Sequence, residues 1–140
     1  MSKVIAVDFD GTIVTHAYPR IGKEIPFAIE TLLQLQREGH RLILWTVRSG
    51  KLLEEAVDYC KSKGLEFYAV NANFPEEKME ESDSRKVNAN IYIDDRNVGG
   101  LPEWGVIYQI IKGTCTPMYY TQYEVPKPKG FFAQLKERLF

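Results

Sequence analysis

The chain has 140 residues, of which 44% are hydrophobic and 26% charged, and its formal net charge is −1. This composition excludes a disordered or fibrous chain and predicts one globular domain over residues 1–140. The near-neutral charge excludes a global electrostatic attraction to nucleic acid or to an anionic membrane, so any affinity for phosphate has to come from a local site.

The first residues and the cysteines bear on the cellular compartment. The apolar stretch within MSKVIAVDFD is too short, and too soon interrupted by acidic residues, for a signal peptide or a membrane span. Cys60 and Cys115 lie far apart in the sequence without ligand-like neighbours, which favours free thiols over a disulfide or a zinc site. A cytoplasmic protein is therefore expected.

Short apolar runs alternate with helix-like segments along most of the chain. Strands are predicted at residues 4–7, 42–45, 67–70 and 91–93, and helices at residues 25–38 and 49–63. Pro26 near the start of the first helix, Ser49 before the second, and Gly39 and Gly64 after them are typical of helix boundaries. Because parallel strands need crossover connections, this order predicts an α/β fold, a Rossmann-like three-layer α/β/α sandwich with a mainly parallel sheet.

The remaining segments are less regular. The polar stretch 71–86 is expected to hold at most one short helix and is too short for a further domain. After two consecutive glycines, residues 104–111 are predicted to supply a fifth strand. Residues 116–140 are predicted to form a C-terminal arm, rich in tyrosine and proline, and a last helix over residues 131–140.

Reactive polar side chains stand at the ends of three predicted strands. Asp8 ends the first run, Thr46 ends the second, and Asp94 with Asp95 ends the fourth. The carboxyl ends of parallel strands lie along one edge of a sheet, so these groups are expected to converge on one crevice. Carboxylates brought together there need a cation, and hard oxygen ligands with an open side suit Mg²⁺.

The turn after Asp8 adds two further elements of a phosphate site. Gly11 permits a tight turn behind Asp10, and the backbone N–H groups of such a turn can bind a phosphate. Once the charge of the phosphate is neutralised, a carboxylate can attack phosphorus in line and form an aspartyl-phosphate. A second acid two residues further along can protonate the leaving oxygen.

The run Asp8-Phe9-Asp10-Gly11-Thr12 after an apolar strand resembles the first motif of the haloacid dehalogenase (HAD) superfamily. Thr46, Lys86 and the Asp94-Asp95 pair follow in the order of the other motifs of that superfamily. The resemblance covers the chain up to this acidic pair. It implies a HAD-like fold and a phosphoryl-transfer activity.

Each motif position has a role that the resemblance implies. Asp8 would be the nucleophile and a ligand of Mg²⁺. Asp10 would be the general acid and then the base that activates water, and its backbone carbonyl would also bind the metal. An aspartate at position 10 leaves a phosphatase or a phosphomutase, since dehalogenases of the superfamily lack an acid there and its transport ATPases carry threonine.

The other motif residues would bind the phosphoryl group and the metal. Thr46 would hydrogen-bond the phosphoryl group, and Lys86 would neutralise charge on that group and on the nucleophile. Asp94 would be the remaining protein ligand of Mg²⁺, with Asp95 as an outer-shell or alternative ligand. Arg48 and His16 are open cases: Arg48 could bind a distal anion or form a surface ion pair, and His16 could contact substrate or be incidental.

The expected activity is a Mg²⁺-dependent phosphomonoester hydrolase without a cap domain, because the two positions where the superfamily inserts caps hold only short segments. The substrate class stays open between a small phosphorylated metabolite and a macromolecular phosphoester, and a second subunit of a homo-oligomer or the C-terminal arm could cover the site. A receiver-like phosphoacceptor domain is one alternative, although its acidic pair would precede the acceptor. A catalytically silent phosphate-binding protein is the other.

Overall fold

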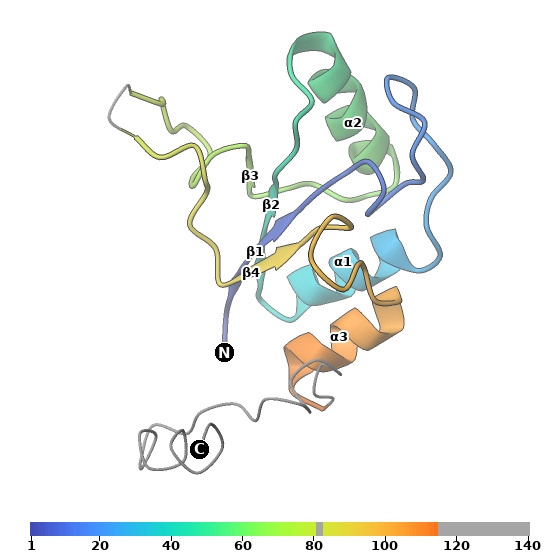
Figure 1. The fold of residues 1–140 in the computed structure, drawn as a ribbon. Helices are drawn as coiled ribbons and strands as arrows, with labels where there is room; N and C mark the ends of the chain where they lie inside the picture. Colours follow the sequence, from blue (N-terminus) through green and yellow to red (C-terminus); the bar gives the residue numbers. More distant parts are fainter. Residues whose placement is uncertain (81–82, 115–140) are drawn as a thin grey trace, which may run out of the picture. The chain divides into compact units, whose positions relative to one another are not determined.

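The computed structural model describes residues 1–80 and 83–114 and contains a four-stranded parallel sheet and three helices (Figure 1). The elements follow one another as β1 (Val4–Val7), α1 (Ala28–Arg37), β2 (Arg41–Leu44), α2 (Gly50–Ser62), β3 (Ala69–Val70), β4 (Ile91–Ile93) and α3 (Trp104–Lys112). This is the predicted α/β, Rossmann-like fold.

The sheet has the strand order β3-β2-β1-β4, with every neighbouring pair parallel. Val7, the last residue of β1, pairs with Leu44 of β2 and with Ile93 of β4, and Leu44 pairs with Val70 of β3. Since the last residues of all four strands are in register, the residues that follow them emerge along one edge of the sheet.

Glycines end both helices that connect the first three strands. Gly39 and Gly64 take the left-handed conformation, with φ of 92° and 85°, as expected for residues that follow a helix C-cap. Ser49 occupies the N-cap position of α2, as predicted, but its side chain makes no capping hydrogen bond. Helix α1 begins later than predicted, because Phe27 has a φ of 66° and Ala28 is the first helical residue.

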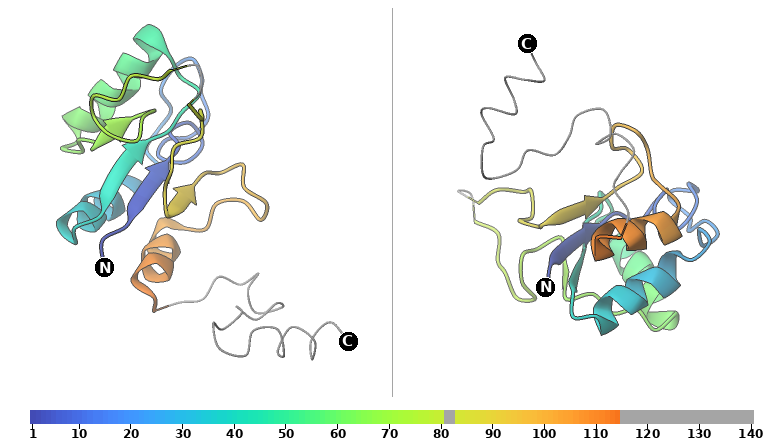
Figure 2. Two further views of the ribbon diagram at one scale, coloured as in Figure 1. Left: turned by 90° about the vertical axis from the view of Figure 1, so that its left-hand side faces the viewer. Right: turned by 90° about the horizontal axis from the view of Figure 1, so that it is seen from below.

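The two faces of the sheet are covered differently (Figures 1 and 2). Helices α1 and α2 lie on one side, where Leu32, Leu35 and Cys60 are fully buried. On the other side Ala6, Ile43 and Ala69 pack against Val87 from the connection between β3 and β4. In its described residues this connection contains no helix, so the second covering layer here is an extended segment.

The prediction of a strand over residues 104–111 is wrong, because these residues lie in helix α3. Trp104, Ile107 and Ile111 are buried, and their spacing of three and four residues places them on one face of a helix. The run is almost continuously apolar, and such a run does not by itself distinguish a buried strand from a buried helix.

The chain divides into two compact units, Met1–Tyr108 and Gln109–Phe140. The first unit contains the sheet and every predicted site residue. The C-terminal arm, its tyrosines, the helix predicted over residues 131–140 and Cys115 lie outside the described residues. None of the helices in the described ranges has the length and apolar character needed to span a membrane.

Candidate active site

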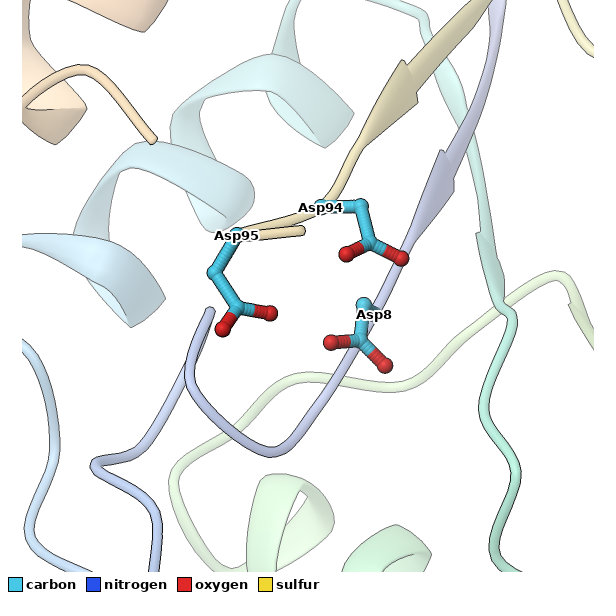
Figure 3. Close-up of side chains that lie close together, drawn as sticks. All are labelled: Asp8, Asp94 and Asp95. Atoms are coloured by element: carbon cyan, nitrogen blue, oxygen red, sulfur yellow. The ribbon is translucent and has the colours of Figure 1, made fainter. Parts of the chain in front are cut away.

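Strands β1 and β4 end side by side, and this brings their acidic residues together. The backbone N–H of Asp8 donates to the carbonyl of Ile93 at 3.0 Å, which extends the pairing of the two strands by one residue. Asp94 and Asp95 follow directly. Figure 3 shows the three side chains close together at the ends of the two strands.

The carboxylates of Asp8, Asp94 and Asp95 each offer an oxygen atom such that the three atoms lie within 4.8 Å of one another. All three residues are partly accessible to solvent. An open cluster of hard oxygen donors is what Mg²⁺ prefers in proteins, so the residues present fit this ion. Asp95, expected only as an outer-shell or alternative ligand, is a full member of the cluster.

The clustering of negative charge changes how these acids bind protons. Burial, with repulsion from Asp94, raises the pKa of Asp8 from 3.8 to about 7. Burial also acts to raise the pKa of Asp95, but hydrogen bonds with His16 and Asp8 outweigh it, and the pKa of Asp95 is lowered. In the protein without a cation, this raised pKa lets Asp8 hold a proton up to about neutral pH.

Thr12 links the two sides of the cluster. Its hydroxyl lies 3.2 Å from Asp8 Oδ2 and 3.3 Å from Asp95 Oδ1, and it accepts a hydrogen bond of 3.1 Å from the backbone N–H of Asp95. The indole Nε1–H of Trp104 donates to the backbone carbonyl of Thr12 at 3.0 Å. Thr12 is fully buried, so this hydroxyl holds the acids in place and is not exposed to a substrate.

Gly11 has a φ of 84°, and a Cβ atom at this position would overlap with the side chains of His16 and Asp95. The position thus requires glycine both for its conformation and for its lack of a side chain. The N–H of Gly11 donates to the carbonyl of Val14 at 2.7 Å. Since this donor is used within the loop, a phosphate would have to replace that bond or bind to other amides.

His16 joins the site through Asp95. Its Nε2 lies 2.9 Å from Asp95 Oδ2, and its side chain is half exposed. The histidine, left open from sequence, therefore lies beside the acidic cluster.

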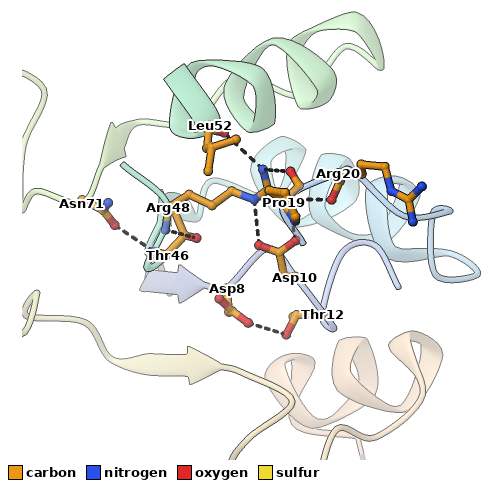
Figure 4. Close-up of polar contacts among 9 residues, drawn as sticks. All are labelled: Asp8, Asp10, Thr12, Pro19, Arg20, Thr46, Arg48, Leu52 and Asn71. Carbon is orange, nitrogen blue, oxygen red and sulfur yellow. Dashed lines mark hydrogen bonds and ion pairs between the residues drawn. The ribbon is translucent and has the colours of Figure 1, made fainter. Parts of the chain in front are cut away.

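Asp10 does not join the carboxylate cluster but pairs with Arg48. Arg48 Nε donates to Asp10 Oδ2 at 2.7 Å and its Nη2 donates to Asp10 Oδ1 at 2.8 Å (Figure 4). The Arg48 side chain is buried, which contradicts one of the two alternatives left open for it, a surface ion pair. The hydrogen bond to Asp10 raises the pKa of Arg48, and burial lowers it by less. The net pKa is raised, so the guanidinium stays charged.

Thr46 follows β2 and is held in place by a residue that sequence reasoning missed. Its backbone N–H donates to Asn71 Oδ1 at 2.8 Å, and its hydroxyl accepts a hydrogen bond of 3.1 Å from the N–H of Arg48. Asn71 follows β3 and has a φ of 49°, a conformation that asparagine tolerates better than most residues. Its position just after a strand was the available signal.

The site opens into a cleft of about 690 Å³ whose polar lining includes Asp8, Thr46, Arg48, Asn71, Arg85, Lys86 and Asp94. Arg48 borders this cleft, but its side chain has no exposed surface. Three of the predicted strand-end groups and the predicted lysine therefore face one space. The ammonium group of Lys86 lies 4.8 Å from the centre of the Tyr92 ring. Lys86 thus borders the cleft, with its charge placed over an aromatic ring.

Comparisons with known proteins found one similar solved structure. No family model matches the chain, and no curated protein matches it. A conserved protein from Bacteroides thetaiotaomicron has a similar structure, with a TM-score of 0.80 and 58% sequence identity over 89% of this chain and 100% of that chain. The chain therefore belongs to the same family as this conserved Bacteroides thetaiotaomicron protein.

Proposed function

We propose that this protein is a Mg²⁺-dependent phosphomonoester hydrolase that forms an aspartyl-phosphate on Asp8. The observation that carries the proposal is the cluster of Asp8, Asp94 and Asp95 at the carboxyl edge of a parallel sheet, beside a cleft that Thr46 and Lys86 also line. The ordered motifs that resemble those of the HAD superfamily support the same reaction. On this basis we infer a capless member of that superfamily.

The reaction that we propose has two chemical steps. In the first, a carboxylate oxygen of Asp8 forms a bond to phosphorus while the bond from phosphorus to the leaving oxygen breaks, and Asp10 donates a proton to that oxygen. In the second, Asp10 takes a proton from a water molecule that attacks phosphorus. The bond between phosphorus and Asp8 then breaks, which releases inorganic phosphate and restores the carboxylate.

The surrounding residues provide the charge balance that this reaction needs. Asp8 and Asp94 would hold Mg²⁺, together with the backbone carbonyl of Asp10 that the resemblance implies, and a bound ion would neutralise the phosphoryl oxygens. Thr46 would hydrogen-bond the phosphoryl group and Lys86 would offset its charge. Burial and repulsion from Asp94 disfavour the charged form of Asp8, the form that attacks. A bound cation would therefore favour the attacking form of Asp8.

The experiment is hydrolysis of an aryl phosphate in the presence of EDTA and after addition of Mg²⁺. We expect no turnover in EDTA, recovery with Mg²⁺, and a loss of about 10³-fold or more in kcat for Asp8→Asn, because this change removes the nucleophile and a metal ligand. Asp58→Asn, which makes the same charge change on the exposed side of α2, is the matched control. Equal rates with EDTA and with Mg²⁺ would contradict the metal assignment.

The fate of the phosphorylated protein separates this proposal from a signalling role. A hydrolase should lose the phosphoryl group within the time of a turnover, whereas a receiver-like domain would retain it. Mass spectrometry of the protein after reaction with a small phosphodonor gives the answer directly. A screen of phosphorylated metabolites and phosphorylated macromolecules then defines the substrate.

A further inference from the structure

Arg48 is among the most deeply buried side chains of the protein, with 1% of its surface exposed. Arginine carries five N–H donors on its side chain. Two of them bind the two oxygens of Asp10, as described above. The others donate to the backbone carbonyls of Pro19 at 3.1 Å, Arg20 at 2.9 Å and Leu52 at 3.3 Å (Figure 4).

Aromatic rings enclose the same guanidinium group. The centres of the Phe9 and Tyr18 rings each lie 5.2 Å from Arg48 Cζ. With every donor used and these two rings beside it, the guanidinium could bind a substrate phosphate only by giving up several hydrogen bonds inside the protein. The arrangement thus argues against the distal-anion role that the sequence left open for this residue.

Arg48 binds Asp10 in a bidentate manner, so the pair fixes the rotation of the carboxylate as well as its position. The remaining bonds of Arg48 tie this carboxylate to two other parts of the structure, the loop at residues 18–20 and the first turn of α2. Asp10 itself lies on the turn after β1, two residues beyond Asp8. A group that transfers a proton has to be placed within hydrogen-bond reach of its partner, and displacement by one ångström lowers rates strongly.

We propose that Arg48 is a positioning residue for Asp10. It holds the Asp10 carboxylate in the orientation from which it serves the leaving oxygen and then the attacking water, without contacting the substrate itself. This inference rests on the proposed function, because it concerns the acid and base of that reaction. The rival explanation is that Arg48 only stabilises the fold by filling a buried space and satisfying backbone carbonyls.

A cycle of variants distinguishes the two explanations: Arg48→Met, Asp10→Asn and the double variant, with Arg48→Lys as the conservative change. Arg37→Met, which alters an exposed arginine of α1 that is bonded to Gln34, is the matched control. Each protein is first checked for folding by circular dichroism and thermal unfolding. The kinetic measurements are kcat and KM for an aryl phosphate and for an alkyl phosphate, whose leaving group needs a proton far more.

We expect Asp10→Asn to lower kcat for the alkyl phosphate by about 10²–10⁴-fold, the usual range for an acid–base group. Arg48→Met should lower kcat by about 10²-fold, more for the alkyl than for the aryl ester, while KM changes by less than about threefold. Arg48→Lys, which cannot make the two-pronged contact, should lie between Arg48→Met and the wild type. In the double variant kcat should equal that of Asp10→Asn alone, since a positioning residue has no effect once the group it positions is gone.

Three results would overturn the positioning role. The first is a wild-type kcat in Arg48→Met. The second is a loss in the double variant equal to the product of the two single losses, and the third is an equal loss for both esters. If Arg48→Met does not fold, Arg48→Lys and its double variant with Asp10→Asn provide the same comparison. A wild-type protein without phosphatase activity would instead reject the proposed function, so the two failures are distinguishable.

Discussion

Replacing Asp8 by asparagine should stabilise the protein at alkaline pH when no metal is present. Burial and repulsion from Asp94 raise the pKa of Asp8 from 3.8 in the unfolded chain to about 7 in the folded protein. The folded state therefore binds this proton more tightly, and the resulting stability is complete below pH 3.8 and lost as the pH rises through about 7. Above that range the folded protein holds a charged carboxylate in unfavourable surroundings.

The size of the effect follows from the rise in pKa. A rise of this extent corresponds to at most about 4 kcal/mol, since each pH unit is worth about 1.4 kcal/mol. Asp8 is partly exposed, and solvent screens its interaction with Asp94, so we expect about 1–2 kcal/mol in the free energy of unfolding. Asparagine has nearly the same shape and keeps an oxygen that can accept the hydrogen bond from Thr12.

Urea denaturation in EDTA at about pH 8 measures the difference between Asp8→Asn and the wild type. The gain should shrink as the pH is lowered to about 5, and addition of Mg²⁺ should favour the wild type, because a ligand that binds the folded state stabilises it by mass action. Asp58→Asn again serves as the control for a change of charge at an exposed site. A lower unfolding free energy for Asp8→Asn at about pH 8 in EDTA would refute the reasoning.

Two further substitutions test the geometry of the site. Gly11→Ala should lower the free energy of unfolding by about 2–4 kcal/mol, because it combines a left-handed backbone with steric overlap. Gly39→Ala has a left-handed backbone but open space around it, so it should lower the free energy of unfolding by only about 1 kcal/mol in the same urea measurement. Equal losses in the two variants would refute the overlap at Gly11. Asn71→Gly keeps the left-handed backbone but removes the acceptor for the Thr46 N–H, so kcat/KM for an aryl phosphate should fall about tenfold. The control Arg37→Met should leave kcat/KM unchanged, and an unchanged value for Asn71→Gly would show that Thr46 is placed without Asn71.

The fold was predictable where the signal is local in the sequence. Strands β1 and β4 have the predicted bounds, and α1 and α2 end at the predicted glycines. The error at residues 104–111 has a physical origin, since the hydrophobic effect rewards burial of an apolar run in either conformation. The sequence of the run alone does not decide between a helix and a strand. Tertiary contacts decide it, such as the hydrogen bond from the indole N–H of Trp104 to the backbone carbonyl of Thr12.

Some residues of the candidate site were predictable from the sequence and others were not. The acids at strand ends were predictable because parallel topology alone brings them to one edge, whatever their side-chain contacts. Their partners were not. Arg48 reaches Asp10 across 38 residues of sequence, Thr12 reaches Asp95 across 83, and Asn71 reaches Thr46 across 25. No local pattern specifies such pairs, because each depends on the rotamer and burial of both side chains.

The hydrogen bonds inside the cluster also distinguish Asp94 from Asp95 as candidate cation ligands. Both oxygens of Asp95 are engaged, Oδ2 with His16 at 2.9 Å and Oδ1 with Thr12 at 3.3 Å. Asp94 accepts a bond on Oδ1 from the N–H of Arg96 at 2.8 Å, and its Oδ2 has no donor among the residues that the structure describes. A cation could therefore take Oδ2 of Asp94 with no hydrogen bond to disturb, whereas at Asp95 it would share an oxygen with His16 or Thr12. In the proposed site Asp95 would then act on a cation mainly through its charge, and the hydrogen bonds from His16 and Thr12 hold that charge in place.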